Sequence, residues 1–298
     1  MVYKEVHCVT ALNKLKRNIP YSWDLNIYRG CEHGCVYCYA MYSHQYLDKE
    51  NFFQEVNIKT NVVETLEKQL SSSSWRQEVV NIGGVTDSYQ QAESFYRIMP
   101  DILKLFIQYK TPCIISTKSD LVLRDYDLID ELSHITYVNI AATITTMDET
   151  IRKKIEPQGV DSLKRFAMLK AFSKTNASIG LHFMPIIPYL TDTFENVDAL
   201  YSHAKDSNIS YVLPGTLYLR GTTRNFFFDF IKREYPHLYD PLKLLYQTGG
   251  APKEYKNELY KMVNSLKDKY ELPSSYTAPM KEKLKKEEYT QLSLFDLN

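Results

Sequence analysis

The sequence predicts an α/β fold in which parallel strands alternate with helices around one sheet. Short apolar runs rich in β-branched and aromatic residues recur along the chain, and helical patterns separate them. Nearly every position of these runs is apolar, which is typical of strands whose two faces are both covered. Alternating strands and helices favour parallel strands joined by right-handed crossovers. Such a sheet is either open or curled into a barrel, and periodicity alone does not decide between the two.

The apolar runs have the length and composition of strands. We expect them near residues 24–28, 78–82, 113–117, 137–144, 178–184 and 210–213. Ligands of parallel α/β sheets bind at the carboxyl ends of the strands, so functional residues are expected there.

The first clear helical pattern covers residues 92–109. It places apolar side chains on one helical face, namely Phe95, Ile98, Met99, Ile102, Leu105 and Phe106. A longer pattern at 148–172 is expected to break around Pro157-Gln158-Gly159, because proline ends or kinks a helix.

The second half of the chain becomes increasingly helical. Thr193 begins another helix, with Glu195 in the first turn where a carboxylate suits the helix dipole. From Arg224 the pattern is helical, most clearly at 255–270, and the composition shifts to Lys and Glu after Pro273. We expect a flexible tail from about residue 281.

Composition excludes several classes of protein. The 298 residues carry 36 Lys+Arg and 36 Asp+Glu, so no overall basic charge attracts nucleic acid or an acidic membrane surface. With 44% apolar and 24% charged residues the chain is an ordinary globular protein rather than a disordered one. No apolar stretch approaches the length of a membrane span, and no secretory signal is visible at the start. We therefore expect a cytoplasmic protein.

Three of the five cysteines lie within eight residues, directly after the first predicted strand: Cys31, Cys35 and Cys38. Soft thiolate ligands select zinc or an iron–sulfur cluster. A structural zinc ion needs a fourth ligand, which His33, Cys8 or Cys113 would have to supply. A [4Fe–4S] cluster held by only three cysteines keeps one iron open, which is a catalytic arrangement.

The Cys-x3-Cys-x2-Cys spacing, with Tyr37 before the last cysteine, resembles the signature of the radical S-adenosylmethionine (SAM) superfamily. Four segments further resemble the branch related to spore photoproduct lyase, often labelled DNA repair photolyase. These segments are residues 21–31, 35–40, 84–90 and 116–119. The resemblance implies an α/β fold, a partial (β/α)6 TIM-type barrel with a C-terminal helical extension and a flexible tail. It places an N-terminal extension at 1–20, the barrel at 21–222, the helical region at 223–280 and the tail at 281–298.

The resemblance also implies the chemistry. It implies that the open iron of a [4Fe–4S] cluster binds the amino and carboxylate groups of SAM. One electron then cleaves SAM to methionine and a 5′-deoxyadenosyl radical, and this radical removes a hydrogen atom from the substrate. A flavodoxin or ferredoxin would supply the electron. The substrate expected is nucleic acid, in DNA repair or modification. The alternatives are RNA, a peptide or a small molecule as substrate, or a clamp-associated iron–sulfur sensor without turnover.

Further positions are candidates for binding SAM. Gly83 and Gly84 end the second strand, and their bare backbone can approach the SAM amino group. Lys118 ends the third strand and is a candidate partner of the SAM carboxylate, or else a solvated loop lysine. Thr143 ends the fourth strand, where it can contact the ribose, and Tyr37 can lie beside the adenine.

The segment Thr86-Asp87-Ser88 is open to two interpretations. Thr86 and Asp87 can orient a polar group of SAM or substrate, or Asp87 can cap the following helix. Arg152 and Glu156 either match a pattern of the family or form an exposed i, i+4 ion pair on a helix. His182 is either a core histidine or a side chain that points into the barrel.

One departure from the lyase concerns its hydrogen-donating cysteine. The lyase has this cysteine near the end of the second strand, where residues 81–87 of this chain contain none. Cys113 begins the next strand and is expected to be a small buried residue, and Cys8 precedes the barrel. Repair of a thymine lesion by the lyase's own route is therefore not expected.

The tail resembles the short peptide by which many bacterial polymerases and repair proteins dock on the sliding clamp. The residues that carry this resemblance are Gln291, Leu292, Leu294 and Phe295. Docking would tether a chain with no net basic charge to DNA. The alternative is that these apolar side chains pack back on the domain as a terminal anchor.

Overall fold

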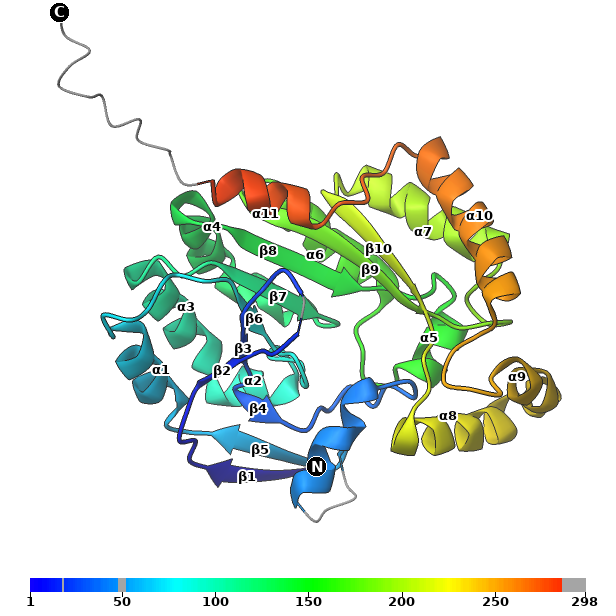
Figure 1. Cartoon of the computed structure of the whole chain (residues 1–298), viewed down its shortest axis with the longest axis horizontal. Helices are drawn as coiled ribbons and strands as arrows, with labels where there is room; N and C mark the ends of the chain where they lie inside the picture. Colours follow the sequence, from blue (N-terminus) through cyan, green and yellow to red (C-terminus); the bar gives the residue numbers. More distant parts are fainter. Residues whose placement is uncertain (18, 48–51, 286–298) are drawn as a thin grey trace, which may run out of the picture.

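The computed structural model describes residues 1–17, 19–47 and 52–285, and its centre is a sheet with parallel strands in sequence order. Six parallel strands are present in this part of the chain (Figure 1): β3 (Trp23–Leu25), β6 (Val80–Ile82), β7 (Cys113–Thr117), β8 (Val138–Thr143), β9 (Ser178–Ile186) and β10 (Tyr211–Thr216). β2 (Leu12–Lys14) pairs antiparallel with β3 at one edge. Because each strand lies beside its predecessor, the predicted (β/α)6 partial barrel is confirmed.

Helices follow the strands and cover one face of this sheet (Figure 1). They are α1 (Val62–Leu70), α2 (Gln91–Tyr96), α3 (Ile98–Gln108), α4 (Tyr126–Ile135), α5 (Glu149–Ile155), α6 (Ser162–Phe172) and α7 (Phe194–Asp206), with short 3₁₀ helices η1 (Tyr39–Leu47) and η2 (Asp120–Asp125). The break predicted around 157–159 separates α5 from α6. Thr193 caps α7 by accepting a hydrogen bond from the Asn196 N–H at 3.2 Å, as predicted.

The two faces of the sheet differ in chemistry. Side chains that point toward the helices, such as Ile115, Ile140 and Leu181, belong to the main hydrophobic core. Successive side chains of a strand alternate between faces, so Asn139 and His182 point to the inner face. The expectation of strands that are apolar on both faces is therefore wrong for the inner face, which carries polar groups.

The first predicted strand, residues 24–28, is divided between two sheets. β3 ends at Leu25, and Tyr28 and Arg29 form β4, which pairs antiparallel with β5 (Glu55–Lys59). β1 (Val2–Val6) pairs in parallel with the other edge of β5. The Tyr28 ring is fully buried and its hydroxyl donates to Glu93, which draws the chain away from the large sheet. The cysteine segment therefore leaves from this small sheet.

The helix predicted at 92–109 is broken at Arg97, which has a φ of 50°. Pro100 has no N–H to continue the helix, and the Glu93 carboxylate accepts hydrogen bonds from the N–H groups of Ile98 and Met99 at 3.1 and 3.0 Å. The break changes the helical phase, so the expectation that Phe95 is buried is wrong; it is 67% exposed. The apolar residues predicted after the break are buried.

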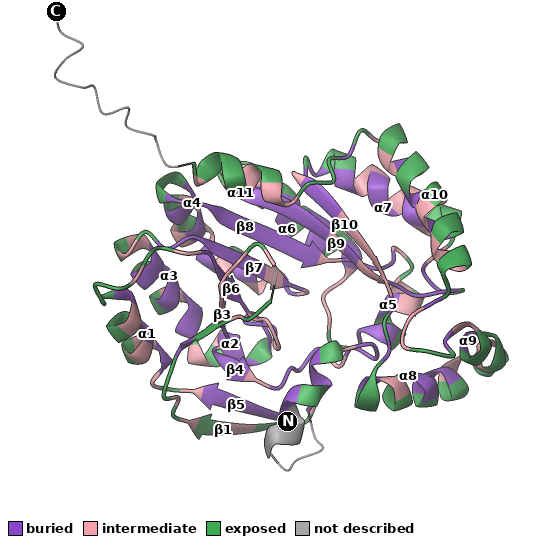
Figure 2. Ribbon diagram, viewed as in Figure 1, coloured by how far each residue is buried: buried purple, intermediate pink, exposed green. Residues whose placement is uncertain are grey.

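The C-terminal part is helical, with α8 (Gly221–Glu234), α9 (Tyr239–Leu245), α10 (Lys253–Lys269) and α11 (Thr277–Lys283), and a 3₁₀ turn η3 (Pro236–Leu238). α11 extends past residue 281, where the tail was expected to begin, because Met280 packs against Val79, Ile114 and Tyr137. Figure 2 shows buried strands enclosed by helices with exposed outer faces. None of the helices in the described ranges is both long and apolar enough to cross a bilayer.

Candidate functional site

The three cysteines lie on a loop, residues 31–38, that follows β4 through a glycine turn. Gly30 has a φ of 95°, a left-handed conformation that glycine adopts without strain. A Cβ on Gly30 would also collide with the Glu55 carbonyl of β5. The turn therefore needs glycine, and it directs the loop toward the carboxyl ends of the parallel strands.

One side of the loop is bound to the segment between β6 and α2. The Thr86 hydroxyl donates to the Gly30 carbonyl at 2.6 Å, and the Gln90 amide nitrogen donates to Gly30 O at 3.3 Å and to the Thr86 hydroxyl at 3.1 Å. Thr86 was predicted to contact the cofactor, whereas its hydroxyl here fixes the start of the cysteine loop.

Glu32, the second residue of the loop, is buried and fully engaged. Its carboxylate accepts hydrogen bonds from the Tyr3 hydroxyl at 2.6 Å and from the Ala92 N–H at 2.7 Å, and its N–H donates to the Gln90 amide oxygen at 2.9 Å. Tyr3 belongs to β1, so the first strand of the chain supports the cysteine loop directly.

The other side of the loop packs on the connection between α5 and α6. The Val36 N–H donates to Ile155 O at 3.0 Å, and the Gln158 N–H donates to His33 O at 3.2 Å. Gly34, with a φ of 67°, lies so close to Pro157 that a Cβ would approach the proline ring to 3.0 Å. The loop is thus held between two strand–helix connections.

His33 bridges the two connections. Its Nε2 lies 2.8 Å from Asp87 Oδ2, and its Nδ1 lies 3.2 Å from the Gln158 carbonyl. Both ring nitrogens are therefore engaged by oxygens of the protein. His33, together with hydrogen bonds to the carboxylate, holds the pKa of Asp87 well below its usual range despite burial. His33 therefore has no nitrogen left for a zinc ion.

Asp87 is saturated by protein donors. Besides His33, it accepts hydrogen bonds from the Thr117 hydroxyl and from the N–H groups of Lys118 and Tyr89, all within 3.0 Å. Asp87 thus joins the cysteine loop to the end of β7, and it does not cap α2 through the N-cap position, which is Gln90.

A second buried charge lies behind Tyr37. The Tyr37 hydroxyl donates to Glu156, whose carboxylate lies 2.6 Å from Arg165 Nη1, with both charged side chains fully buried. Burial raises the pKa of Glu156, but the charges of Arg165 and Lys118 outweigh it and leave the pKa below its usual value. The sequence did not indicate Arg165, because its partner lies across a loop.

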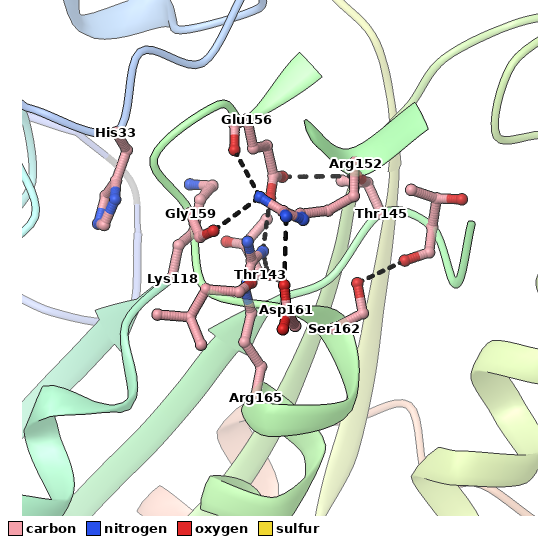
Figure 3. Close-up of polar contacts among 12 residues, drawn as sticks. His33, Lys118, Thr143, Thr145, Arg152, Glu156, Gly159, Asp161, Ser162 and Arg165 are labelled. Atoms are coloured by element: carbon pink, nitrogen blue, oxygen red, sulfur yellow. Dashed lines mark hydrogen bonds and ion pairs between the residues drawn. The ribbon is translucent and has the colours of Figure 1, made fainter. Parts of the chain in front are cut away.

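Arg152 closes that loop rather than forming an exposed ion pair with Glu156. Its guanidinium donates to the carbonyls of Glu156 and Gly159 at 3.0 and 2.7 Å and lies 3.2 Å from Asp161 Oδ1 (Figure 3). Arg152 is only 4% exposed, so the interpretation as a surface pair is wrong. The connection between α5 and α6 is rigidly tied, which fixes the wall behind Tyr37.

Lys118 follows β7 and presents a cation at this end of the sheet. Within the described part of the chain, no side chain lies at ion-pair or hydrogen-bond distance from its ammonium group, and the Tyr37 ring centre is 6.0 Å away. Burial opposes its charge, but the nearby Cys35, Glu156 and Asp87 raise its pKa. Lys118 is therefore a charged group available to an anionic ligand.

The three thiols are shielded from water. Cys31 and Cys35 are 8% and 5% exposed and Cys38 is half-buried. Burial raises the pKa of all three thiols, and it raises the pKa of Cys35 to about 12. The pKa of Cys31 is raised further because Cys35 and Cys38 are close to it. Backbone N–H groups of Ala40 and Met41 hydrogen-bond the Cys38 sulfur. Such thiols ionise only when a cationic centre binds them, so the loop fits an iron–sulfur cluster.

Among the described residues, the three thiols are not gathered with other ligands around one point. Within residues 1–17, 19–47 and 52–285, no three His, Cys, Asp or Glu side chains gather closely enough to hold one metal ion. In an iron–sulfur cubane each thiolate binds a different iron, so the sulfurs need not converge on one point. Cys113 is fully buried in the main core, as predicted, and cannot serve as a fourth ligand.

The remaining predicted cofactor contacts lie at the same end of the sheet. Gly83, with a φ of 84°, and Gly84 follow β6, and a Cβ on Gly84 would lie 2.7 Å from the Asp24 carboxylate. Thr143 ends β8, and its carbonyl accepts a hydrogen bond from Arg165 at 2.7 Å. The clamp-like residues Gln291, Leu292, Leu294 and Phe295 lie outside the described residues.

Comparisons with known proteins agree with this geometry. The family model of the radical SAM superfamily matches residues 25–201. An uncharacterized protein of Mycobacterium tuberculosis is 33% identical over 282 residues, which cover 93% of this chain and 83% of that protein. One of Methanocaldococcus jannaschii is 26% identical over 245 residues, 82% of this chain and 86% of the other.

Solved structures share the fold. Spore photoproduct lyase complexed with dinucleoside spore photoproduct aligns with a TM-score of 0.66 and 12% identity, covering 90% of this chain and 79% of the lyase. A radical SAM methyltransferase from Sphaerobacter thermophilus aligns with a TM-score of 0.52 and 11% identity, covering 85% and 65% of the two chains. The family resemblance and the lyase-like fold expected from the sequence are both confirmed.

Proposed function

The chain belongs to the radical SAM superfamily. We propose that it is an enzyme that holds a [4Fe–4S] cluster on Cys31, Cys35 and Cys38. We further propose that it uses SAM for radical chemistry on nucleic acid, in DNA repair or modification. One observation carries the proposal. A buried three-cysteine loop and the available cation of Lys118 meet at the carboxyl end of one parallel sheet.

In this superfamily the reduced cluster and SAM together supply a 5′-deoxyadenosyl radical, which removes a hydrogen atom from the substrate. The protein's part is to bind and orient. Lys118 pairs with the SAM carboxylate, and the backbone of Gly83 and Gly84 receives the amino group. Thr143 contacts the ribose, and the backbone of Tyr37 faces the adenine, since its hydroxyl is engaged by Glu156.

Thr86 and Asp87 act through the loop rather than on the cofactor. Their side-chain oxygens are hydrogen-bonded to Gly30 and His33, on the two sides of Cys31. We assign both as positioning residues that keep Cys31 in place.

Two features support nucleic acid as the substrate. The fold resembles that of spore photoproduct lyase, a protein solved with a dinucleoside photoproduct. Large aromatic side chains are also exposed beside the cysteine loop and at the start of α8: Tyr39 (64%), Tyr218 (55%) and Phe226 (41%), with Arg220 over the Tyr218 ring. Thr223 of α8 donates to the Cys38 carbonyl, so α8 is joined to the loop. Exposed rings with a nearby arginine suit stacking of unpaired bases.

The proposed route differs from that of the lyase at the return of the hydrogen atom. The segment directly after β6, residues 83–90, contains no cysteine, and Cys113 faces the helices rather than the inner face. The enzyme we propose therefore takes no hydrogen atom from a second cysteine at the lyase's position, and a flavodoxin or ferredoxin supplies its electron.

The experiment is anaerobic reconstitution of the full chain with iron and sulfide, followed by reduction, addition of SAM and quantification of 5′-deoxyadenosine. We expect product from the wild type and none from Cys35→Ala, which should also lose iron and the brown absorbance. Cys8→Ser is the matched control and should keep both, because Cys8 lies beside Asn61, away from the loop. Full iron and sulfide in Cys35→Ala would refute the ligand assignment, and an intact cluster that binds no SAM would indicate a sensor.

We also propose that the tail docks on a sliding clamp. Leu294 and Phe295 would fill an apolar pocket while Gln291 hydrogen-bonds at its rim. The double variant Leu294→Ala/Phe295→Ala should lose clamp binding in surface plasmon resonance and keep its SAM affinity. Equal clamp binding by the wild type and this variant would rule the docking out.

A further inference from the structure

Three side chains form a row across the inner face of the sheet. The backbone pairing sets Thr117 opposite Ala142 and Thr143 opposite His182, so Lys118, Thr143 and His182 follow one another on neighbouring strands. Adjacent strands are about 4.8 Å apart, which separates the first and last members of the row by about 10 Å. The inner-face row beneath has small residues, Ser116, Ala141 and Gly180, and the Tyr211 ring packs over Gly180 and reaches His182 from there.

A chain of hydrogen bonds determines which nitrogen of His182 carries a proton. Asn139 Nδ2 lies 3.1 Å from the Ser178 carbonyl, which can only accept, so the amide orientation is fixed and Oδ1 faces Tyr211. The Tyr211 hydroxyl, 3.0 Å from Oδ1, must therefore donate to it. His182 Nε2 lies 3.1 Å from the same hydroxyl, whose proton is already used, so Nε2 carries the hydrogen.

His182 is consequently a neutral ring with a bare Nδ1. Two groups face the His182 ring: the charged Lys118 and the titratable Tyr211 hydroxyl. Burial, together with the Lys118 charge, lowers the pKa of His182 to about 4. In the described part of the chain, Nδ1 of His182 has no hydrogen-bond partner. The atom is nevertheless not sealed off by protein atoms. It is an acceptor open to a ligand on the inner face.

We propose that Nδ1 of His182 accepts a hydrogen bond from an N–H or O–H group of the SAM nucleoside, and that Tyr211 and Asn139 are positioning residues that fix its tautomer. The order of the row supports this choice of ligand. With the SAM carboxylate at Lys118 and the ribose beside Thr143, the nucleoside extends toward His182. The inference rests on the proposed function and adds to it a residue that selects for the nucleoside.

The first test reads the tautomer. Nitrogen-15 NMR of the full chain, labelled at histidine and carrying the oxidised cluster, should show His182 with its proton on Nε2. Tyr211→Phe keeps the ring that packs over Gly180 but removes the hydroxyl, and it should give a mixture of both tautomers. A wild-type ring protonated at Nδ1 would overturn the inference.

The second test reads SAM affinity by anaerobic calorimetry. In His182→Gln the side chain can still donate toward Tyr211 but no longer offers the Nδ1 acceptor, so the Kd for SAM should rise about three- to tenfold. Tyr211→Phe should give a smaller rise in the same direction. His134→Gln, an equal change at an exposed histidine of α4, is the control and should bind SAM like the wild type.

The outcomes separate this inference from the proposed function. A wild type that binds SAM while His182→Gln binds it equally well overturns the role of His182 and leaves the proposed function intact. A wild type with a cluster that binds no SAM overturns both. An Nε2–H tautomer together with weaker binding in His182→Gln, but not in His134→Gln, is the result that the inference requires.

Discussion

Two histidines at the same end of the sheet have opposite surroundings. His33 lies between two acceptors, the Asp87 carboxylate and the Gln158 carbonyl, and both of its nitrogens are used. His182 has one nitrogen bound to the Tyr211 hydroxyl, and its other nitrogen is open. The first clamps two connections of the protein together, and the second is a neutral side chain with an acceptor to offer. The comparison teaches that the partners of a ring, not its burial, decide whether it keeps an acceptor for a ligand.

The largest effect is expected from breaking the clamp. His33→Gln leaves the buried Asp87 carboxylate without its imidazole partner and should lower the free energy of unfolding by about 3 kcal/mol or more. The matched change His182→Gln should alter it by no more than about 1 kcal/mol, since only a hydrogen bond is affected. Chemical denaturation of both variants measures the contrast, and equal losses would show that His182 is also structural.

The pH dependence of stability should separate the two regions. The pKa of His182 is about 4 in the folded protein against 6.5 unfolded, so the unfolded state binds the proton first. The titration of His182 therefore leaves the free energy of unfolding unchanged above pH 6.5 and lowers it as the pH falls toward 4, by about 3 kcal/mol.

The pKa of Asp87 is lowered below its usual value, so the contribution of that carboxylate is lost only at still lower pH. Denaturation curves between pH 4 and 7 test this. His182→Gln should flatten the slope in this range, in which Asp87 stays ionised. An unchanged slope in His182→Gln would mean that other groups cause it.

Lys118 links the two regions, and its replacement should sharpen the comparison. Its N–H donates to Asp87, whereas its charge lowers the pKa of His182. Lys118→Met keeps the backbone bond and removes the charge, so the clamp should survive while SAM affinity falls about tenfold. Calorimetry with SAM measures this, with iron content as the control. Unchanged affinity would remove Lys118 from the binding site.

The sequence predicted the parts of the fold that depend on local patterns. The apolar runs located the parallel strands, and Pro157 and Thr193 marked a break and a helix start. It missed β1, β2, β5, α1 and α4, whose apolar stripes are short or mixed with charges. The break at Arg97 was missed because Glu93 replaces the helical bonds from the side.

The candidate site was predicted where residues are close in sequence and missed where they are not. The cysteine spacing is a local pattern, and so is the position of Lys118 after its strand. The pairings His33–Asp87 and Glu156–Arg165 depend on how separate loops meet, which no local pattern records. The expectation of an exposed Arg152–Glu156 pair failed for the same reason.

The strand at the start of the chain has a consequence for how the protein is made. β1 is synthesised before its partner β5, which ends at Lys59, so the small sheet cannot close until the chain has been synthesised through Lys59. Tyr3 can bind Glu32 in the cysteine loop only after that closure. The loop is therefore completed by folding of the nascent chain around it, and any metal delivered to it earlier would meet an open, water-exposed set of thiols.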